Sequence, residues 1–218
     1  MQKVFLRGPG NSSRKSTDVG ERIAGGGAGD IYKLPDLGGQ VLKIYKPSAD
    51  KVLYAGKLEA MLANEPKFMS KASRKDFPLL AWPVSVAEDK QGKFLGFAMP
   101  EIDFSNTVSL ERMLQTRMRE VSNLPSFYGY RLLAALNLAS IVAELHKIGH
   151  HIIDLKPVNC RLHPEKMLIS ILDCDGFSIN GKGRKRFHAA QFSEEYIAPE
   201  ASNREPADLG EEQDLFAL

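Results

Sequence analysis

The stretch His151–Asn159, HIIDLKPVN, carries the most specific chemical signal in this sequence. It places a carboxylate (Asp154), an ammonium group (Lys156) and a side-chain amide (Asn159) within six residues. Transfer of a phosphoryl group needs a carboxylate that orients the acceptor hydroxyl, a cation near the phosphate and oxygen ligands for Mg²⁺. The three side chains fit these three tasks, so the stretch predicts a site for phosphate chemistry.

A pair of carboxylates follows fourteen residues after Asn159. Asp173 comes directly after the apolar run Ile169–Leu172, and Asp175 lies two residues further on. Residues two apart on an extended strand share a face, so both are candidate metal ligands. We favour Asp173 because a strand would deliver it to the site. The alternative register makes Asp175, in Asp175-Gly176-Phe177, the principal ligand.

A glycine-rich segment, Gly25-Gly26-Gly27-Ala28-Gly29, lies upstream between two β-like runs. Glycine lets the backbone approach phosphate oxygens, and successive N–H groups can form an anion-binding concavity. Glycine-rich hairpin turns are also common, so the segment alone is a weak signal. Lys43, on the apolar run Val41–Ile44, strengthens it because a strand lysine beside such a loop can reach phosphate. An outward-facing strand lysine is the alternative.

The hydrophobic pattern predicts a β-rich part followed by a helical part, with residues 1–20 as a flexible leader rich in Gly, Ser, Pro and charge. The helix at 128–146 is apolar on nearly all sides and is expected to be buried. The strands are predicted at 22–24, 30–34, 40–45, 79–86, 93–99, 161–162 and 167–172, and the helices at 52–64, 109–118 and 128–146.

Composition allows one domain or two small lobes, because the 218 residues are 43% hydrophobic. The net charge of +2 gives no electrostatic case for nucleic acid or anionic membrane as a partner. The basic run Lys182–Arg186 is interpreted as a solvated loop, with an acidic protein substrate as the weaker alternative. Two cysteines give no disulfide framework, and no signal peptide or membrane span is recognised. We therefore expect a soluble, cytoplasmic protein.

Taken together, these motifs resemble the protein kinase superfamily. Asp154–Asn159 resembles its catalytic loop, and Ala24–Tyr32 resembles its glycine-rich loop with alanine at the first glycine. Tyr196–Glu200, YIAPE, looks like the segment that closes the activation loop, and Asp214–Leu218 looks like the start of the helix that anchors the C-lobe. In the details of its motifs, such as LKIYKP and LDCDGF, the chain is similar to atypical bacterial serine/threonine kinases.

The resemblance covers about residues 21–218 and implies an α+β, two-lobed kinase-like fold. The expected parts are a β-rich N-lobe (21–100), a hinge (101–104) and an incomplete helical C-lobe (105–218). Because the chain ends just inside the anchoring helix, we expect a truncated C-lobe. Apolar surface around Phe216 and Leu218 should then be uncovered, and we expect either low activity of this fragment or self-association through that surface.

The resemblance also assigns roles. Asp154 would orient the acceptor hydroxyl, with Lys156 and Ser193 beside it. Lys43 would hold phosphates and pair with an acid of the 52–64 helix. Glu59 is favoured over Glu65, because Glu65 precedes Pro66 and should lie beyond the helix end. ATP is expected to contact Gly25, Gly26, Gly27, Gly29, Ile31, Val41, Lys43, Glu59, Met99, Pro100, Glu101 and Ile102, and Mg²⁺ to contact Asn159, Asp173 and Asp175.

The sequence departs from the family pattern at two places. Ile152-Ile153 stands where His-Arg is usual, and Cys174-Asp175 stands where Phe-Gly is usual. Without that arginine, activity is expected not to require phosphorylation of the activation segment. The leading prediction is an ATP- and Mg²⁺-dependent kinase that acts on Ser/Thr of proteins. A pseudokinase that only binds nucleotide and a small-molecule kinase are the alternatives; the latter class usually lacks an APE-like segment.

Overall fold

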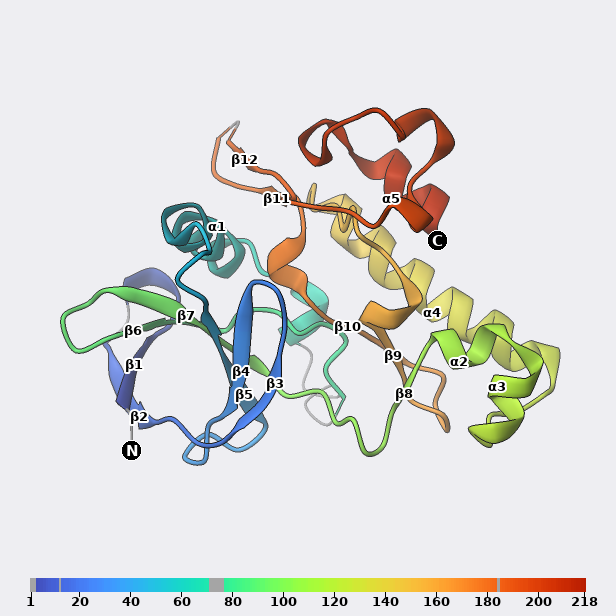
Figure 1. Cartoon of the computed structure of the whole chain (residues 1–218), viewed down its shortest axis with the longest axis horizontal. Coiled ribbons are helices and arrows are strands. Elements are labelled where there is room, and N and C mark those ends of the chain that lie inside the picture. Colours follow the sequence, from blue (N-terminus) through green and yellow to red (C-terminus); the bar gives the residue numbers. More distant parts are fainter. Residues whose placement is uncertain (1–2, 12, 71–76, 184) are drawn as a thin grey trace. The chain divides into compact units, whose positions relative to one another are not determined.

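The computed structural model describes residues 3–11, 13–70, 77–183 and 185–218 and combines helices with antiparallel sheets (Figure 1). The predicted mixed α+β class is therefore confirmed. The chain divides into two compact units. Unit 1 contains residues 1–65, 82–101 and 181–185, and unit 2 contains residues 66–81, 102–180 and 186–218.

Unit 1 is built on a curled seven-stranded sheet with the order β2-β1-β6-β7-β5-β4-β3. All its neighbouring strands pair antiparallel. One face carries a hydrophobic core centred on Val4, Leu42 and Ala98, which are fully buried. The strands are β1 (Lys3–Arg7), β2 (Lys15–Asp18), β3 (Arg22–Gly25), β4 (Gly29–Lys33), β5 (Gln40–Tyr45), β6 (Ser85–Glu88) and β7 (Phe94–Pro100).

The predicted flexible leader is wrong for the part of it that the structure describes. Two strands, β1 and β2, form within residues 1–20 and extend the sheet beyond β6. The reason is the alternation in Lys3–Arg7, which turns Val4 and Leu6 into the core while their neighbours face outward. Residues 1, 2 and 12 of the predicted leader lie outside the described residues.

Helix α1 (Lys51–Ala63) corresponds to the helix predicted at 52–64. The Asp50 side chain caps its start by accepting the N–H groups of Val52 (3.1 Å) and Leu53 (3.0 Å). Met61 is fully buried on this helix, and its carbonyl accepts the indole N–H of Trp82. The helix ends at Ala63, so Glu65 does lie beyond it, as predicted.

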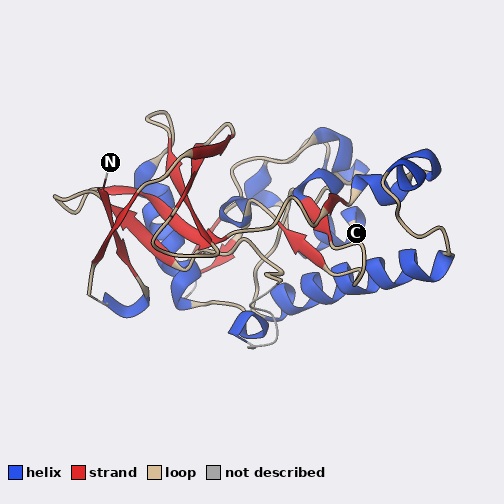
Figure 2. Cartoon of the chain, turned by 90° about the horizontal axis from the view of Figure 1, so that it is seen from below, coloured by secondary structure: helices blue, strands red, loops and turns tan. Residues whose placement is uncertain are grey.

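Unit 2 contains a long helix, α4 (Tyr128–Lys147), and small sheets of short strands (Figure 2). The predicted helix at 109–118 is broken into two, because Gln115 has an extended backbone (φ −108°, ψ 135°). The predicted strand at 79–86 is strand only from Ser85 onward. The remaining elements are β8 (Val108–Ser109), α2 (Glu111–Leu114), α3 (Thr116–Val121), β9 (Cys160–Leu162), β10 (Ile169–Ile171), β11 (Ile179–Asn180), β12 (Arg186–Phe187) and α5 (Glu211–Ala217).

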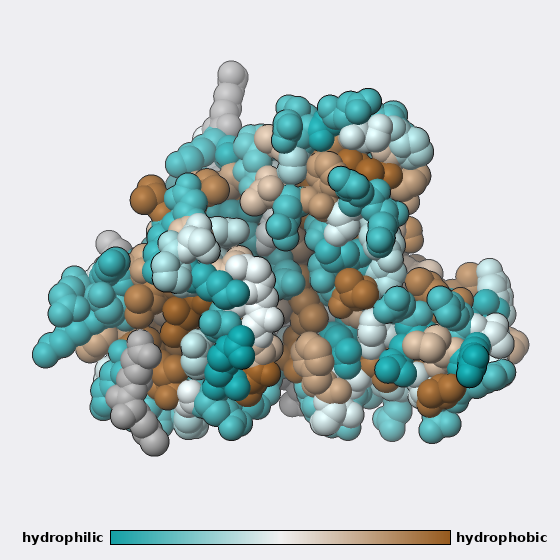
Figure 3. Space-filling view, viewed as in Figure 1, coloured by the Kyte–Doolittle hydropathy of each residue, from teal (hydrophilic) through white to brown (hydrophobic). Residues whose placement is uncertain are grey.

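Apolar side chains remain exposed on α4 and α5. Leu136 of α4 is 62% exposed, so the prediction of a fully buried helix is wrong: its other side packs in the core through Leu138, Val142 and Leu145. Phe216 and Leu218 are 52% and 46% exposed, which confirms the uncovered surface expected there. Figure 3 shows apolar side chains among polar ones over the segment that contains α5.

Neither cysteine forms a disulfide, since Cys160 and Cys174 are both free and buried. Among the described residues, we find no helix with the length and apolar character needed to span a bilayer.

Candidate active site

The stretch His151–Asn159 forms a tight turn in unit 2, and the Asp214 carboxylate binds the backbone of that turn. The N–H groups of Ile152 and Ile153 donate to the Asp214 carboxylate at 2.7 and 2.6 Å. Ile153 has φ 66°, a left-handed conformation that is costly for a β-branched residue. Two short bonds to a fully buried carboxylate compensate for that cost and fix the direction in which Asp154 leaves the turn.

Asp154, Lys156 and Ser193 come together although Ser193 is far away in the sequence. The Lys156 ammonium lies 2.7 Å from Asp154 Oδ2 and donates to Ser193 Oγ at 2.6 Å. The second carboxylate oxygen, Asp154 Oδ1, is buried and has no hydrogen-bond partner in the described part of the chain. A buried acceptor without a donor is rare in native proteins. This oxygen is therefore suited to receive a hydroxyl group from outside the chain.

Asn159 and Asp173 are brought close by the backbone. The N–H of Leu172 donates to the Asn159 carbonyl at 2.8 Å, so the residue after Leu172 begins beside Asn159. Asp173 is exposed and left-handed (φ 52°), whereas Asp175 is buried in a 3-10 turn, Cys174–Gly176. The expectation that both acids share one face of a strand is wrong, because β10 ends at Ile171 and a turn follows.

The residues near Asn159 offer individual oxygen ligands for a metal ion and not a complete set of protein ligands. Within the ranges the structure describes, no cluster of three or more His, Cys, Asp or Glu side chains could hold a metal ion. A magnesium ion needs only one or two carboxylates when nucleotide phosphates and water supply the other ligands. Asn159 and Asp173 fit that limited donor set.

At the position where an arginine is usual in protein kinases, this chain has Ile153, a residue of the hydrophobic core. Ile153 is 1% exposed and packs in a cluster with Ala189, Ala198, Ala201 and Leu209. The YIAPE segment is fastened to α5, where Gln213 accepts the Ala198 N–H at 3.0 Å and donates to the Tyr196 carbonyl at 2.8 Å. Glu200 makes no ion pair within the described residues.

Two groups around the turn were not predicted as part of the site, namely Asp214 as its anchor and His146 beside it. His146 Nε2 lies 2.8 Å from Asp214 Oδ2, and its Nδ1 lies 3.4 Å from Glu211. The hydrogen bond to Asp214 raises the pKa of His146 despite its partial burial. Burial and the nearby Arg186 lower the pKa of His151. The only sequence signal for Asp214 was its place at the start of the segment Asp214–Leu218.

The basic run is partly structural. Arg186 donates to the Ser178 hydroxyl at 3.1 Å and to the Gly149 carbonyl at 3.0 Å. The prediction of a purely solvated loop therefore does not hold for Arg186, while Arg184 lies outside the described residues.

In unit 1, several residues predicted to bind ATP share one sheet face. Register places Lys43 opposite Ile31 on β4, and Val41 opposite Met99 on β7. Directly opposed residues of antiparallel strands project to the same side, as do residues two apart on one strand. This face is the one opposite the core of Val4 and Leu42. It combines apolar side chains with Lys43, a buried lysine that is 7% exposed.

The glycine-rich segment links β3 to β4 as a tight hairpin. A Cβ on Gly29 would lie 2.7 Å from the Ile44 carbonyl oxygen, so glycine is needed there for close packing. Lys46 donates to the Gly26 carbonyl at 2.6 Å, and the Gly26 N–H donates to Gly29 at 2.9 Å. Because the Gly26 amide is used within the turn, a phosphate cradle at this segment would have to use neighbouring amides such as that of Gly27.

The acid expected to pair with Lys43 has a different partner. Glu59 forms an ion pair with Arg7 of β1, and Arg7 also binds Glu88 at 3.0 Å. The Lys43 ammonium lies 5.8 Å from the centre of the Tyr45 ring. The expected Lys43–Glu59 ion pair is therefore replaced by an Arg7–Glu59 ion pair.

At the predicted hinge, Pro100 ends β7 and Glu101 is the last residue of the 82–101 segment of unit 1. The Glu101 N–H donates to the Gly39 carbonyl at 2.9 Å, and its carboxylate forms an ion pair with Lys33. Ile102 belongs to unit 2 and is buried.

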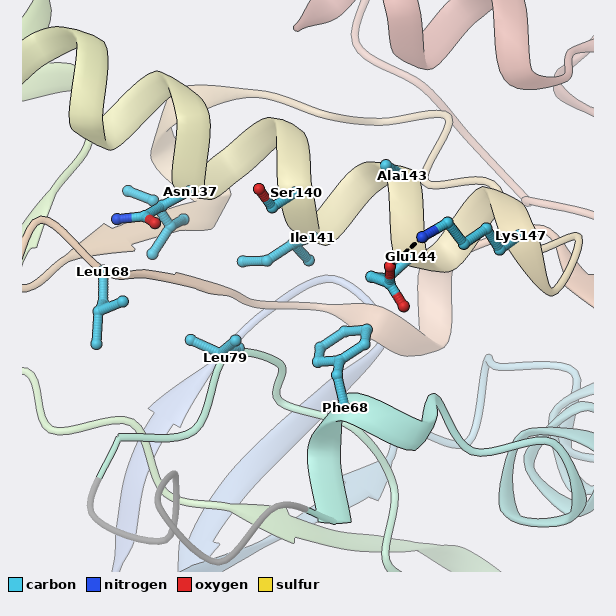
Figure 4. Close-up of a pocket in the computed structure, with 10 residues that line it drawn as sticks. Phe68, Leu79, Asn137, Ser140, Ile141, Ala143, Glu144, Lys147 and Leu168 are labelled. Carbon is cyan, nitrogen blue, oxygen red and sulfur yellow. Dashed lines mark hydrogen bonds and ion pairs between the residues drawn. The ribbon is translucent and has the colours of Figure 1, made fainter.

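Two pockets of unit 2 lie away from these residues. The first, of about 450 Å³, is lined by α4 on one side and by Phe68 and Leu79 on the other (Figure 4). Glu144 and Lys147 form an ion pair at its rim. The second, of about 490 Å³, lies between α4 and α5. Neither pocket includes a predicted site residue.

Comparison with known proteins shows a distant similarity of the chain to a protein kinase. The chain is 25% identical over 221 residues to the protein kinase YegI of Escherichia coli (strain K12). The alignment covers 99% of this chain but 31% of YegI, so the chain spans less than a third of that relative. No family model matches the chain. The chain is thus distantly similar to a named protein kinase.

Proposed function

We propose that this chain is the catalytic part of an ATP- and Mg²⁺-dependent protein kinase that phosphorylates Ser or Thr hydroxyls. The observation that carries this proposal is the contact of Lys156 with both Asp154 and Ser193, which leaves the second, buried oxygen of the Asp154 carboxylate without a donor. A carboxylate held in that way can orient a hydroxyl nucleophile, and a neighbouring ammonium can neutralise charge on the phosphate.

Each group of the turn then has a defined task. Asp154 accepts a hydrogen bond from the substrate hydroxyl and takes up its proton as transfer proceeds. Lys156 lies beside the transferred phosphate, and Ser193 fixes the lysine. Asn159 and Asp173 would hold Mg²⁺, which neutralises phosphate charge when it is bound. Asp175, which is buried, would support the turn or give a further oxygen ligand.

The face of unit 1 that carries Lys43 would bind the nucleotide. Ile31, Val41 and Met99 offer apolar surface for the adenine ring, and Lys43 offers a cation for the phosphates. Backbone groups of the 100–102 segment would contact the edge of the base. We further propose a two-lobed kinase-like fold with parts near 21–100, 101–104 and 105–218. The two free, buried cysteines fit a reducing compartment such as the cytoplasm.

A pseudokinase is the second candidate, and one observation favours it. Glu59 is bound by Arg7, so the lysine–acid pair typical of active kinases is not formed by the two residues expected to form it. Such a protein would bind nucleotide without transferring phosphate.

The test is transfer of labelled γ-phosphate from Mg²⁺-ATP, with a generic protein and with an aminoglycoside or choline as acceptors. The proposal predicts label on serine or threonine of the protein, and loss of transfer when EDTA removes the metal. Label only on the small molecule would point to a small-molecule kinase. Nucleotide binding without transfer to any acceptor would point to a pseudokinase and would contradict the proposal.

A further inference from the structure

An arginine beside the candidate active site is held in place by carbonyl and hydroxyl groups and not by an acid. Arg161 lies on β9, two residues after Asn159. Its Nε donates to the Thr107 hydroxyl at 3.1 Å, and its Nη2 donates to the carbonyls of Thr107 and, at 3.4 Å, of Phe104. Its Nη1 has no acceptor within the described part of the chain. The guanidinium is therefore fixed in position while two of its five N–H donors stay available.

Phe104 gives this arginine an exposed aromatic neighbour. The guanidinium carbon of Arg161 lies 4.3 Å from the centre of the Phe104 ring, and Phe104 is 61% exposed. A planar guanidinium stacks favourably on such a ring, and its orientation is then largely set before any ligand arrives. The two side chains thus combine an oriented cation with an apolar surface that solvent can reach.

A second arginine adds to the positive charge at this place. The Leu110 N–H donates to the Cys160 carbonyl at 2.8 Å, so the start of α2 lies beside β9. Arg112 of α2 donates to the Ser122 hydroxyl at 3.0 Å. Burial lowers the pKa of Arg161, and the nearby charge of Arg112 lowers it further. The two guanidinium groups are therefore close enough to act on the same ligand.

Neither arginine forms an ion pair with an acid of the described residues. Asp103, the acid of the 103–107 loop, instead binds the Ser105 N–H at 2.8 Å and the Asn106 side-chain amide at 2.6 Å. All the hydrogen bonds of the two arginines go to neutral oxygen atoms. Their attraction for an anion from outside the chain is therefore not used up by a carboxylate of the chain itself.

The two arginines lie alongside the candidate catalytic turn, within unit 2. Strands β8 and β9 pair with Ser109 opposite Arg161 (Figure 1). The Ser109 hydroxyl donates to the Pro157 carbonyl at 3.4 Å, and Pro157 lies three residues after Asp154. An extended peptide advances by about 3.3–3.6 Å per residue. A substrate with its hydroxyl at Asp154 can therefore bring a side chain from a few residues away to the arginines.

We propose that Arg161, Arg112 and Phe104 form a specificity site for an acidic side chain of the protein substrate. This inference rests on the proposed function, since it names the class of substrate on which that function would act. The Nη1 group of Arg161 and the Arg112 guanidinium bind the carboxylate, and the Phe104 ring packs against the methylene groups of the same side chain. The chain would then favour Ser or Thr hydroxyls that have Asp or Glu nearby.

Steady-state phosphate transfer by the full chain to two serine peptides tests the proposal. The peptides are identical except that the residues around the serine are glutamates in one and glutamines in the other. The KM should be about tenfold lower for the glutamate peptide, as expected for a charge-assisted hydrogen bond. Equal KM values would overturn this inference alone. Absence of transfer to any acceptor would instead overturn the proposed function, and this inference with it.

Three variants connect the preference to the arginines. Arg161→Gln should raise the KM of the glutamate peptide by about tenfold, close to that of the glutamine peptide. Arg161→Glu should reverse the preference, toward a peptide with lysines around the serine, which loss of a purely structural arginine would not do. Arg112→Gln should also weaken the preference. It keeps every contact of the 103–107 loop and so serves as the test if the Arg161 variants do not fold.

Two control variants remove a positive charge elsewhere. Arg117→Gln on the exposed side of α3 and Lys182→Gln in the basic run should both keep the preference for the glutamate peptide. If Lys182→Gln removes that preference and Arg161→Gln does not, the basic run recognises the acid and the proposal is wrong. An increase in the KM for ATP in Arg161→Gln, without a change for the peptide, would mean that this arginine binds nucleotide phosphate, which would also overturn the proposal.

Discussion

The turn at His151–Asn159 and helix α1 were both assigned roles from the same resemblance, and they differ in outcome. In the turn, Asp154 and Lys156 are in contact and Ser193 joins them. On α1, the acid expected to face Lys43 is bound by Arg7 instead. A short turn fixes the direction of each side chain through the backbone. The face on which a helical residue lies can be predicted only if the rotation of the helix about its axis is known. Here the ion pair between Arg7 of β1 and Glu59 sets that rotation.

The largest effect is expected at the turn. Asp154→Asn should lower phosphate transfer by roughly 10²-fold or more while ATP affinity stays nearly unchanged, because the amide cannot accept the proton. Transfer rate and ATP affinity measured side by side check this. Asp208→Asn, an exposed acid of the same unit, should leave transfer unaffected. Equal transfer by Asp154→Asn and the unsubstituted chain would show that the turn is not catalytic.

The next effect tests the α1 side of the comparison. Lys43→Met should weaken ATP binding by about tenfold to a hundredfold, since one charge-assisted contact to phosphate is lost. Glu59→Gln should have little effect, because its ion pair with Arg7 is partly exposed. Lys90→Met on the exposed β6–β7 turn serves as the control. A strong loss of ATP affinity in Glu59→Gln would restore the expected Lys43–Glu59 pair and refute our account of α1.

Substitution of Asp214 should lower the free energy of unfolding of the chain. Asp214→Ala leaves the N–H groups of Ile152 and Ile153 without acceptors, at about 1–3 kcal/mol each. Denaturant unfolding should therefore show a loss of about 2–6 kcal/mol, with Asp214→Asn less affected because its one oxygen can still accept. A loss below about 1 kcal/mol would mean that the strained turn at Ile153 is held by other contacts.

A smaller effect concerns pH. The folded state raises the pKa of His146, so its contribution to stability is complete below the unfolded pKa of about 6.5 and disappears as pH rises through the folded value. The lowered pKa of His151 acts in the opposite direction, costing stability as pH falls below about 6.5. The stability difference between the unsubstituted chain and His146→Gln should therefore shrink as pH rises above 6.5. A difference that is constant from pH 5 to pH 9 would exclude this coupling.

The last prediction concerns a treatment that should not change activity at all. Phosphatase treatment should leave transfer activity unchanged, since Ile153 occupies an apolar cluster and offers no charge for a phosphorylated segment. Loss of activity after treatment would show that another cation binds such a phosphate.

Much of the fold could be predicted because its signals are local. The alternation in Gln40–Tyr45 and the Asp50 cap of α1 act within a few residues, and both elements formed near the predicted bounds. The break at Gln115 and the strands of the supposed leader could not be predicted so well. Pairing between β1 and β6 joins residues about eighty positions apart, and no local pattern specifies such a partner.

The candidate site likewise contains residues that a local motif predicted and residues that only contacts between distant parts of the sequence identify. Asp154, Lys156 and Asn159 were readable from one short motif, whereas Asp214 and His146 act through contacts across more than sixty residues. Strand alternation was the wrong rule for Asp173 and Asp175, because the chain leaves β10 and turns before either carboxylate. The partner of Glu59 carried no signal in the sequence either, because Arg7 lies on β1, about fifty residues before it.

The most direct test of the central claim is a crystal structure of the full chain with Mg²⁺ and a non-hydrolysable ATP analogue. The account predicts that the phosphates contact Lys43, and that the Asn159 and Asp173 oxygens each bind the metal at about 2.1 Å. A metal bound by Asp175 with Asp173 turned away would contradict the assignment of the ligands. A nucleotide seated away from Lys43, for example in the pocket along α4, would contradict the proposed function itself.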